Sequence, residues 1–435
     1  MLTLFLLVTW DGHFLIRYGG SGIYKTHLFG SPSVIVCKAE ACRMVLTDEK
    51  RFKIGYPEAT LKLVGSATFA KDSFAERKRI RRLATSPIVG HAALALYVDR
   101  IEDIIVNSLE EWASMSMKSP VQLLNELKHL TFKVIIHIFM GSHNHPIISQ
   151  IGDLYNHVHR ALYAIPINIP GFAYHKALQA RTKLERIIQC VAKERRIMNK
   201  RMGEEKEGSE RDLLDILLDG EDENGQKLED EDIANLTVGF LFAGHETSAH
   251  AIMWSIIYLT HHPHIMSRAK EEQEEMLRTR QQDQKGLNVQ EIKQMVFLAK
   301  VIDETLRLAN ISFSLFREAR VDVNINGYSI PRGWKVLVWL RAVHLDPEYY
   351  TDPLQFNPSR WDDYCAKPGS YLPFGAGTRL CSGIDLVKLE MSIFLHYFLL
   401  HYKVEQVNPN CPVTYWPAMP KPTDNCLARV IKLIS

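Results

Sequence analysis

Hydrophobic residues recur with a helical period through most of the chain, from about Glu40 to Arg307. Residues spaced 3.6 positions apart lie on one face of a helix, so this stretch predicts a series of amphipathic helices. Prolines and charged residues interrupt the period and predict connections between those helices. The interruptions lie at Pro87, Pro146, Pro166–Pro170 and Arg201–Arg211, and Gly203–Arg211 is the best candidate for a surface loop.

Two other segments show the alternating pattern of strands. Ser21–Val36 contains two short runs of strand-forming residues on either side of Gly30-Ser31-Pro32, which predicts a hairpin. Between Asp322 and Arg341, hydrophobic residues alternate around Asn326-Gly327, a pair typical of a tight hairpin turn, and Lys335–Trp339 then predicts a further strand. The predicted fold class is therefore mainly α with a smaller β portion.

The longest periodic segment runs from Asp230 to His262 and stops before Pro263. Its first residues are acidic, as the helix dipole favours at a helix N-terminus. Such a helix is roughly 50 Å long at 1.5 Å per residue, enough to cross a domain. Its middle is apolar but contains Asn235, His245, Glu246 and His250, so a buried central helix is favoured over a membrane span.

The chain shows no internal repeat and no linker rich in Gly, Ser or Pro, so a single domain is expected over residues 18–435. Residues 1–17 are expected to be an atypical N-terminal segment without a membrane anchor. Met1–Val8 is apolar over eight residues, whereas a spanning helix needs about 20. No basic region precedes this run and no cleavage site follows it, so a signal peptide is not predicted.

The composition excludes several classes of protein. With 435 residues and 46% hydrophobic residues, the chain can form a large core, which excludes a disordered or low-complexity protein. The net charge of +2 gives no support for nucleic-acid binding. The seven cysteines contain no C-x-x-C pair, which indicates neither a disulfide framework nor a four-cysteine zinc site and favours a reducing compartment.

One cysteine lies in a distinctive loop. Phe374–Gly383 carries Gly375, Gly377, Arg379 and Cys381, and a helical pattern begins at Ile384. Free N–H groups and the dipole at a helix start favour a thiolate, which is a strong ligand for haem iron, and an arginine beside it can neutralise a propionate. A dinucleotide-binding turn is disfavoured by Pro373 and by the glycine spacing. For Cys381 alone, a buried structural cysteine remains the alternative.

The complete pattern F-x-x-G-x-R-x-C-x-G resembles the haem-binding loop of the cytochrome P-450 superfamily, the haem-thiolate monooxygenases. Three further segments match the family's motifs in the same order. This resemblance implies the cytochrome P-450 fold, with haem b between the long central helix and the cysteine loop, and Cys381 as the axial iron ligand. The matching segments are Ala243–Thr247 for oxygen activation, Glu304–Arg307 for E-x-x-R, and Phe356–Trp361, whose Arg360 joins Glu304 and Arg307 in a buried cluster.

The resemblance also implies roles for single residues. Gly244 leaves room for dioxygen and substrate, the Thr247 hydroxyl donates a hydrogen bond during oxygen activation, and Glu246 passes protons inward through water. A structural role, in which Thr247 bonds back to a helix carbonyl, stays open. Residues expected to bind haem besides the ligand are Phe374, Gly375, Arg379, Arg317, Arg81 and Arg77, although Arg77 stands where the family usually has Trp or His.

The long matching stretches place the chain near the plant group that contains beta-amyrin 11-oxidase and ent-kaurenoic acid oxidase. SGIYKTHLFG at residues 21–30 and PTDNCLA at residues 422–428 lean toward its triterpene branch. A beta-amyrin-type triterpene is therefore the expected substrate, and a diterpenoid acid is the alternative. The residues expected to line the substrate pocket are apolar, and they are Phe240, Phe242, Ala243, Ile311, Phe313, Leu315 and Phe316.

The same resemblance implies partners and a location. Electrons are expected from NADPH through a separate flavoprotein, NADPH-cytochrome P-450 reductase. The basic run from Arg77 to Arg82 is expected to be the docking surface for this acidic reductase. The alternative is that the run is only a solvent-exposed helix face. The expected location is the cytosolic face of the endoplasmic reticulum membrane. Because the family's anchor is missing before Tyr18, a truncated and inactive haem-binding scaffold is the alternative of another class.

Overall fold

A computed structural model describes residues 20–65, 74–85, 88–141, 146–162, 164–202, 212–280, 284, 286–362, 366–415 and 419–433. The expected N-terminal segment 1–17 and the expected surface loop 203–211 lie outside the described residues. The described residues form two compact units. The first unit comprises residues up to 56, 101–128 and 247–435, and the second comprises residues 57–100 and 129–246.

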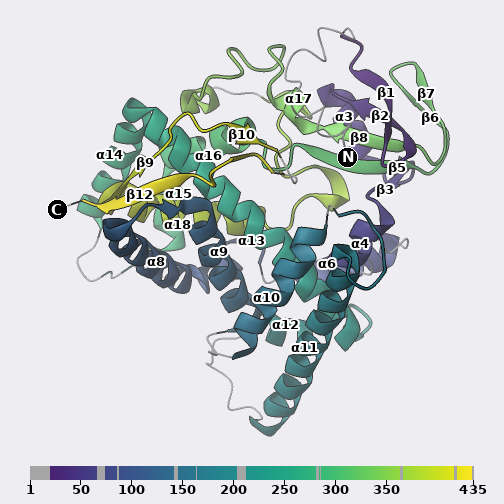
Figure 1. Cartoon of the computed structure of the whole chain (residues 1–435), viewed down its shortest axis with the longest axis horizontal. Helices are drawn as coiled ribbons and strands as arrows, with labels where there is room; N and C mark the ends of the chain where they lie inside the picture. Colours follow the sequence, from purple (N-terminus) through teal and green to yellow (C-terminus); the bar gives the residue numbers. More distant parts are fainter. Residues whose placement is uncertain are drawn as a thin grey trace. The chain divides into compact units, whose positions relative to one another are not determined.

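The first unit contains a five-stranded sheet in the order β1-β2-β8-β5-β3 (Figure 1). The β1–β2 hairpin is antiparallel and confirms the prediction, while β2 runs parallel to β8, with Val36 beside Val338. The continuous hydrophobic run of β8 after Lys335 is buried, as a central strand requires. The strands are β1 Ile23–Leu28, β2 Ser31–Val36, β3 Phe52–Ile54, β5 Ser314–Ala319 and β8 Lys335–Trp339.

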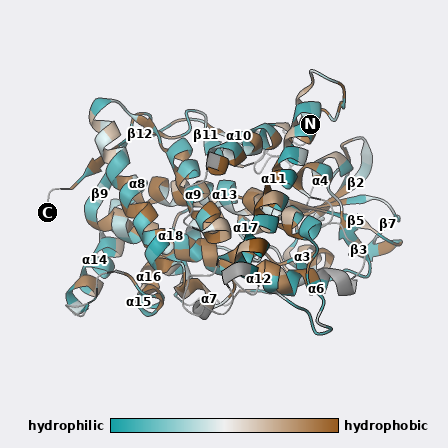
Figure 2. Cartoon of the chain, turned by 90° about the horizontal axis from the view of Figure 1, so that it is seen from below, coloured by the Kyte–Doolittle hydropathy of each residue, from teal (hydrophilic) through white to brown (hydrophobic). Residues whose placement is uncertain are grey.

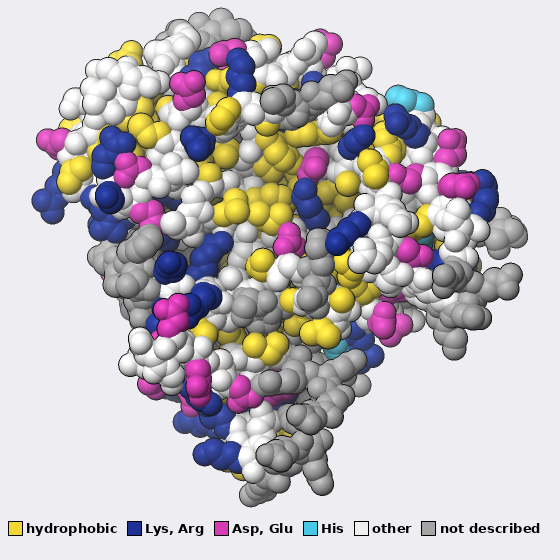
Figure 3. All heavy atoms as spheres, turned by 180° about the vertical axis from the view of Figure 1, so that it is seen from behind, with side chains coloured by type: hydrophobic (Ala, Val, Ile, Leu, Met, Phe, Trp, Pro, Cys, Tyr) yellow, Lys and Arg dark blue, Asp and Glu magenta, His cyan; other side chains and the backbone are white. Residues whose placement is uncertain are grey.

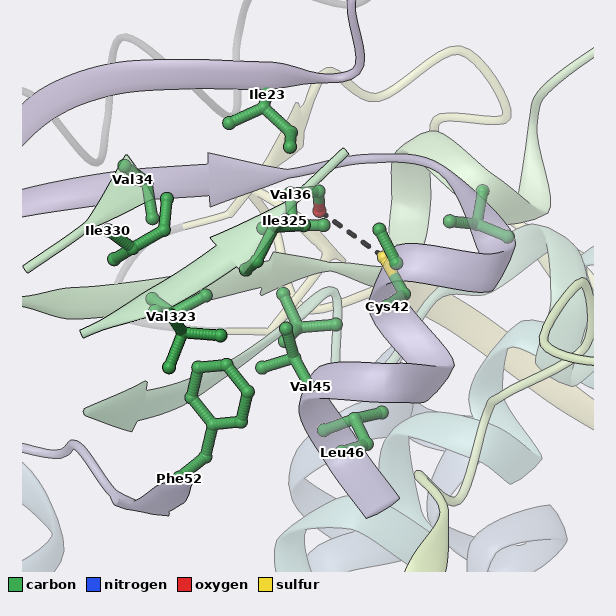
Figure 4. Packing of buried hydrophobic residues seen from close by; sticks show 14 of the residues in the cluster. Ile23, Val34, Val36, Cys42, Val45, Leu46, Phe52, Val323, Ile325 and Ile330 are labelled. Atoms are coloured by element: carbon green, nitrogen blue, oxygen red, sulfur yellow. Dashed lines mark hydrogen bonds between the residues drawn. The ribbon is translucent and has the colours of Figure 1, made fainter. Parts of the chain in front are cut away.

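Helix α3 (Ala39–Thr47) packs against this sheet through a hydrophobic cluster (Figure 4). Val45 and Leu46 lie on the side of α3 that faces Phe52, and the Cys42 thiol donates a hydrogen bond to the Val36 carbonyl at 3.3 Å. Burial raises the pKa of the Cys42 thiol well above its usual range, because a buried thiolate would lack solvation. This cysteine is therefore a core residue rather than a ligand.

The second predicted hairpin is also confirmed. β6 (Val323–Ile325) and β7 (Tyr328–Ile330) pair antiparallel, with Val323 opposite Ile330. Asn326 and Gly327 have φ of 49° and 88°, the left-handed values that a tight two-residue turn requires. The Asn324 side chain accepts a hydrogen bond from Gly327 N at 2.9 Å and closes the turn.

Further helices and short strands complete the first unit. Hydrophobic and hydrophilic residues follow one another along the helices, as their amphipathic sequences predict (Figure 2). The helices are α14 Pro263–Thr279, α15 Val289–Gln294, α16 Val296–Ala309, α17 Leu340–His344 and α18 Ile384–His401, with short 3-10 turns η2 Pro358–Trp361 and η3 Gly377–Arg379. The remaining strands are β4 Val121–Gln122, β9 Tyr402–Gln406, β10 Val413–Thr414, β11 Lys421–Pro422 and β12 Leu427–Lys432.

The second unit is helical. Its two longest internal helices, α10 and α11, lie side by side (Figure 1). Arg195 on α11 donates to Asp212 and Asp215 at 2.8 and 2.9 Å, which fastens α12 to α11. The helices are α4 Glu58–Val64, α6 Phe74–Thr85, α7 His91–Ala95, α10 Pro146–Ala161, α11 Ala173–Met202 and α12 Leu213–Asp219.

Three helices have residues in both units: α8 Val98–Lys118, α9 Leu123–Met140 and α13 Asp230–His261. α13 confirms the long helix expected from the sequence, to within one residue of its predicted end. Within the described ranges, no helix has the length and hydropathy of a membrane span. On the face drawn in Figure 3, Lys and Arg side chains are interspersed with Asp and Glu, in keeping with the net charge of +2.

Glu390 on α18 generates a prediction about stability. Its side chain is 1% exposed, and burial raises the pKa of its carboxyl from 4.5 to about 8, with the Ser248 hydroxyl opposing the shift. The folded state therefore holds a proton that the unfolded chain releases, so stability is fully present below about pH 4.5 and falls as the pH rises to about 8. We expect Glu390→Gln to raise the melting temperature by a few degrees near neutral pH.

The measurement is thermal unfolding of both proteins between about pH 5 and pH 8. The difference in melting temperature should widen as the pH rises, because only the wild type must take a proton to keep Glu390 neutral. Glu405→Gln, on an exposed position of β9, is the control and should show no such trend. A difference that does not change with pH would contradict this account.

Candidate functional site

Helix α13 is buried except along one narrow stripe. Between Ile233 and Ile257, every residue is buried except Phe240, Ala243, Gly244 and Thr247. These positions are three, four and seven residues apart, so they share one helix face. Ala243, Gly244 and Thr247 of the predicted oxygen-activation segment therefore lie on the accessible face of α13. His245 and Glu246 of the same segment are buried.

The back of this segment is tightly packed. A Cβ built at Gly244 would lie 2.7 Å from Ile135 Cδ1 of α9, so a larger residue here would require the Ile135 side chain to move. The His245 ring packs against Phe132 and Tyr155 at centroid distances of 5.6 and 4.8 Å. These contacts fix the rotation of α13 about its own axis and thereby keep the accessible stripe in place.

Two predicted site residues on α13 lie off the accessible stripe. Phe242 is buried, with its ring 4.8 Å from that of Tyr155. Glu246 is also buried, and one carboxylate oxygen lies 3.5 Å from His159 Nδ1. Phe240, Ala243 and Thr247 are therefore the α13 side chains that a bound molecule could reach directly, while Glu246 would act from the side of the helix.

The predicted cysteine loop has the tight turns that its glycines suggested. Gly375 and Gly377 have φ of 76° and 73°, and Cys381 N donates to Phe374 O at 3.0 Å. A Cβ at Gly377 would lie 2.9 Å from Leu46 O, so glycine lets the loop sit directly on the end of α3. The loop ends at Gly383, which precedes the first residue of α18.

The Cys381 side chain differs from those of the core cysteines. It is exposed, and its Sγ accepts a hydrogen bond from Gly383 N at 3.4 Å. Cys37, like Cys42, is buried, and its burial raises the pKa of its thiol. An exposed sulfur beside a backbone N–H at a helix start is the arrangement that suits a thiolate ligand.

Glu49 interacts electrostatically with two of the arginines predicted from the sequence, Arg379 and Arg317. Its carboxylate lies 3.5 Å from Arg379 Nε and also accepts a hydrogen bond from the Thr378 hydroxyl. Arg317 on β5 is 6% exposed, and burial lowers the pKa of its guanidinium, while Tyr56 and Glu49 oppose the shift. The first unit therefore holds a partly buried basic group beside the cysteine loop, with an acidic partner that the sequence did not reveal.

The remaining predicted basic residues belong to the second unit. Arg81 is half-buried on α6. The side chain of Arg77, on the same helix, lies outside the described part of the chain. Their relation to Cys381 stays a prediction.

The pocket residues predicted after α16 divide between two faces of the sheet. Leu315 lies next to the cysteine loop, since a Cβ at Gly375 would be 3.4 Å from Leu315 Cδ1. Phe316 points to the opposite face and packs against Tyr56 at 5.2 Å, because successive strand residues alternate. Ile311 and Phe313, which precede β5, are buried.

Glu304, Arg307 and Arg360 form the predicted cluster in the first unit. Glu304 and Arg307 are completely buried, and the guanidinium donates from Nε and Nη2 to the two carboxylate oxygens at 2.8 Å each. Arg360 Nε donates to Glu304 at 3.2 Å. Further donors to the carboxylate are Asn357 N and Trp361 Nε1, each at 3.1 Å. The buried charges of Glu304 and Arg307 are thus paired with each other, and the carboxylate accepts further hydrogen bonds.

A second polar network joins this cluster to the cysteine loop. Arg307 Nη1 donates to His344 O at 2.8 Å, and the His344 ring lies between Asn310 Oδ1 at 2.7 Å and Leu372 N at 2.9 Å. Burial and the neighbouring Arg307 lower the pKa of His344 to about 3, so the ring stays neutral. Since Leu372 N donates to Nε2, the proton is on Nδ1 and is donated to Asn310. Sequence reasoning missed these residues, because neither the spacing of His344 nor that of Asn310 indicates a partner.

Comparison with known proteins gives consistent matches. The sequence profile of the cytochrome P-450 family matches residues 17–425. Beta-amyrin 11-oxidase of Glycyrrhiza uralensis is 60% identical over 420 residues, covering 96% of this chain and 84% of that protein. Ent-kaurenoic acid oxidase 1 of Arabidopsis thaliana is 47% identical over 415 residues, covering 95% and 83%. The solved structure of retinoic acid bound cyanobacterial CYP120A1 has a TM-score of 0.84 at 27% identity, covering 98% of this chain and 94% of that one.

The buried cluster generates a prediction about folding. Glu304→Ala leaves Arg307 buried without its carboxylate, which costs about 3–5 kcal/mol and therefore removes much of the net stability of a domain. We expect a correspondingly lower free energy of unfolding in urea. Glu58→Ala is the control, because Glu58 pairs with Lys62 on the surface and its loss should change stability little. Similar stabilities for the two variants would show that the buried pair is dispensable.

Proposed function

Because the chain belongs to the cytochrome P-450 family, we propose that it is a monooxygenase that inserts oxygen into a hydrophobic plant terpenoid of the beta-amyrin type. Its cofactor is haem with an axial thiolate, and its electrons come from a reductase. When bound, haem supplies the chemistry of dioxygen activation and oxygen insertion. The protein supplies the ligand, a proton path and the orientation of the substrate.

Cys381 is the proposed iron ligand. Its exposed Sγ, the Gly383 N–H that donates to it and the tight turns at Gly375 and Gly377 all suit a flat prosthetic group held by a thiolate. Phe374, whose carbonyl accepts from Cys381 N, would lie beside the group. This exposed cysteine in a rigid loop is the single observation that carries the proposal.

The proposed partners of the haem propionates are Arg317, Arg379, Arg81 and Arg77. A buried guanidinium such as that of Arg317 gains from an added carboxylate, because burial disfavours its charge when it is alone. Glu49 beside Arg379 would hold the basic pair in place until the anionic group binds. These residues are proposed to neutralise and orient the cofactor rather than to take part in the chemical step.

Thr247, Glu246 and Gly244 are proposed to serve oxygen activation. Thr247 belongs to the accessible stripe of α13, so its hydroxyl can donate a proton to a molecule bound there. Glu246 is buried beside His159. From this position its carboxylate could pass protons through water toward Thr247. Gly244 allows the close packing of α9 that holds both residues in register.

The proposed substrate is a triterpene. The apolar side chains Phe240, Ala243, Ile311, Phe313 and Leu315 suit a mostly hydrocarbon molecule, because buried apolar area provides the affinity. Beta-amyrin 11-oxidase, at 60% identity, favours this over the diterpene acid of the ent-kaurenoic acid oxidases, which are 47–48% identical in Arabidopsis thaliana. Phe242 and Phe316, which point elsewhere, are proposed to support the pocket walls.

The remaining proposals concern partner and location. We propose that NADPH-cytochrome P-450 reductase delivers the electrons and that the protein works at the cytosolic face of the endoplasmic reticulum membrane. The support is the similarity to plant oxidases of this family. The inactive haem-binding scaffold is the competing hypothesis, and turnover measurements separate the two.

One experiment tests the proposed iron ligand and the proposed substrate together. The purified protein, with reductase and NADPH, should convert beta-amyrin into an oxygenated product. Its reduced carbon monoxide complex should show the red-shifted Soret band of a thiolate ligand. Cys381→Ala should abolish both, because alanine offers no ligand atom.

Cys190→Ala is the matched control, since Cys190 is exposed on α11 and has no proposed role. It should keep both the Soret band and the turnover. A Cys381→Ala protein that keeps the red-shifted Soret band would refute the ligand assignment. A wild type with the band but without turnover of beta-amyrin or ent-kaurenoic acid would favour the inactive scaffold.

The second prediction separates oxygen activation from substrate binding. Thr247→Val removes the hydroxyl while keeping nearly the same shape, so substrate affinity should change little. The product formed per NADPH should fall several-fold and peroxide release should rise, since the loss of a proton donor costs up to 10²–10⁴-fold. Water can partly replace the hydroxyl, so residual activity is expected.

The control is Thr237→Val on the same helix. Thr237 is buried, and its hydroxyl donates to Ile233 O at 2.8 Å, which is a purely structural bond. NADPH consumption, peroxide and product are measured in all three proteins. If Thr247→Val and Thr237→Val show the same coupling as the wild type, Thr247 has a structural role only.

A further inference from the structure

Two basic side chains of helix α6 are paired with acidic residues of the same unit. Arg79 Nε donates to Asp222 Oδ2, and Arg82 Nη1 donates to Glu223 Oε1. Both acceptors belong to one acidic turn, residues 221–227, which lies between α12 and α13. The acidic turn therefore lies against part of the basic run that the sequence offers to a partner protein.

The acidic turn has a defined shape of its own. Asp222 Oδ1 accepts hydrogen bonds from Asn224 N at 2.8 Å and from Gln226 N at 2.9 Å. At the base of the turn, Glu221 and Lys227 form an antiparallel bridge. Because these bonds close the backbone, the acidic side chains are carried on an ordered hairpin.

Arg79 anchors the acidic turn to α6. Besides its bond to Asp222, its Nη2 donates to the carbonyls of Gln226 and Lys227 at 3.2 and 3.1 Å. Only 20% of the Arg79 side chain and 5% of the Asp222 side chain are exposed. Hydrogen bonds from Gln226 N and from Arg79 lower the pKa of the Asp222 carboxyl. Arg79 is therefore committed to the turn and is a poor contact for a partner protein.

The pair of Arg82 with Glu223 has a different character. The Arg82 side chain is 49% exposed and that of Glu223 is 80% exposed. An ion pair with this exposure contributes little to stability and is screened by salt. A carboxylate of a partner protein can therefore replace Glu223 at Arg82 without disturbing the anchor at Arg79.

The pairing changes the charge that α6 presents. Lys78 and Arg79 lie four and three positions before Arg82, so both are neighbours of Arg82 on the helix surface. Ile80, between them in sequence, is buried, whereas Lys78 is exposed. Since attraction to an acidic partner grows with the positive charge of a surface, a carboxylate beside Arg82 weakens that attraction.

We propose that Glu223 is an internal competitor that occupies Arg82 and thereby weakens the binding of the acidic reductase to α6. Arg79 and Asp222 hold the turn that carries Glu223. This inference rests on the proposed monooxygenase function and adds a control of electron delivery to it. Docking then requires a carboxylate of the reductase to displace Glu223 from Arg82.

The test measures equilibrium binding of the haem-loaded protein to NADPH-cytochrome P-450 reductase at low ionic strength. Glu223→Gln removes the competing charge and nearly keeps the shape, so the dissociation constant should fall about twofold to fivefold, the range of an exposed ion pair. The gain should vanish in about 1 M salt, which screens such charges. Glu194→Gln, at an exposed position of α11, changes the net charge equally and should leave the dissociation constant unchanged.

A double-mutant cycle shows whether Glu223 acts through Arg82. Arg82→Gln alone should weaken binding, and adding Glu223→Gln to it should bring no further change, because no cation is left to release. An equal gain in both backgrounds would indicate general repulsion of the reductase and would overturn the inference. An Arg82→Gln protein that binds as tightly as the wild type would also overturn it.

Turnover of beta-amyrin, measured on the same samples, separates this inference from the proposed function. If Glu223→Gln leaves the dissociation constant unchanged while the wild type turns over with reductase, the inference fails and the proposed function stands. A wild type that neither binds the reductase nor turns over would overturn both.

Discussion

The first unit depends on one buried ion pair, that of Glu304 with Arg307. Two full charges without solvent exposure are tolerated only when each is paired and every donor finds an acceptor. Helix α16 supplies both charges but not enough partners. The missing acceptors are the backbone carbonyls of His344, Pro353 and Gln355, which Arg307 bonds at 2.8, 2.8 and 3.3 Å. The hydrogen bonds of one guanidinium thus fix the backbone of residues 344–355, a segment that has little regular structure.

A chain of hydrogen bonds connects the buried Glu304–Arg307 pair to the cysteine loop. The neutral His344 ring accepts from Leu372 N, so the residues just before Phe374 are held by the same network. Tyr371 adds a second tie, since its hydroxyl donates to Asp303 Oδ1 at 3.1 Å, and Lys388 on α18 donates to the same atom at 2.7 Å. The loop is therefore fixed from α16 and α18 together. A loop held in this way can keep Cys381 exposed without folding back over it.

Local patterns in the sequence predicted the elements that local forces determine. The Asn326-Gly327 turn, the bounds of α13 and the helix after Cys381 follow from turn chemistry, acidic N-termini and periodicity. The short strands β4, β10 and β11 have two residues each, too few to show a periodic pattern, and β4 pairs with β12 near the other end of the chain. The same limit applies to the site: motifs identified Glu304 and Cys381, whereas Glu49 and His344 matter through neighbours far away in the chain.

Gly244 has a packing role that the motif alone does not indicate. The family resemblance suggests that glycine leaves room for a bound molecule, and in addition a Cβ at this position would lie 2.7 Å from Ile135 Cδ1. Glycine therefore serves the contact between α9 and α13, and Ala243 and Thr247 are the neighbouring small residues on the accessible stripe. This contact between α9 and α13 helps to set the rotation of α13 about its own axis. The rotation in turn decides which residues of α13 are accessible to a bound molecule, so the packing of α13 against α9 bears on the proposed chemistry.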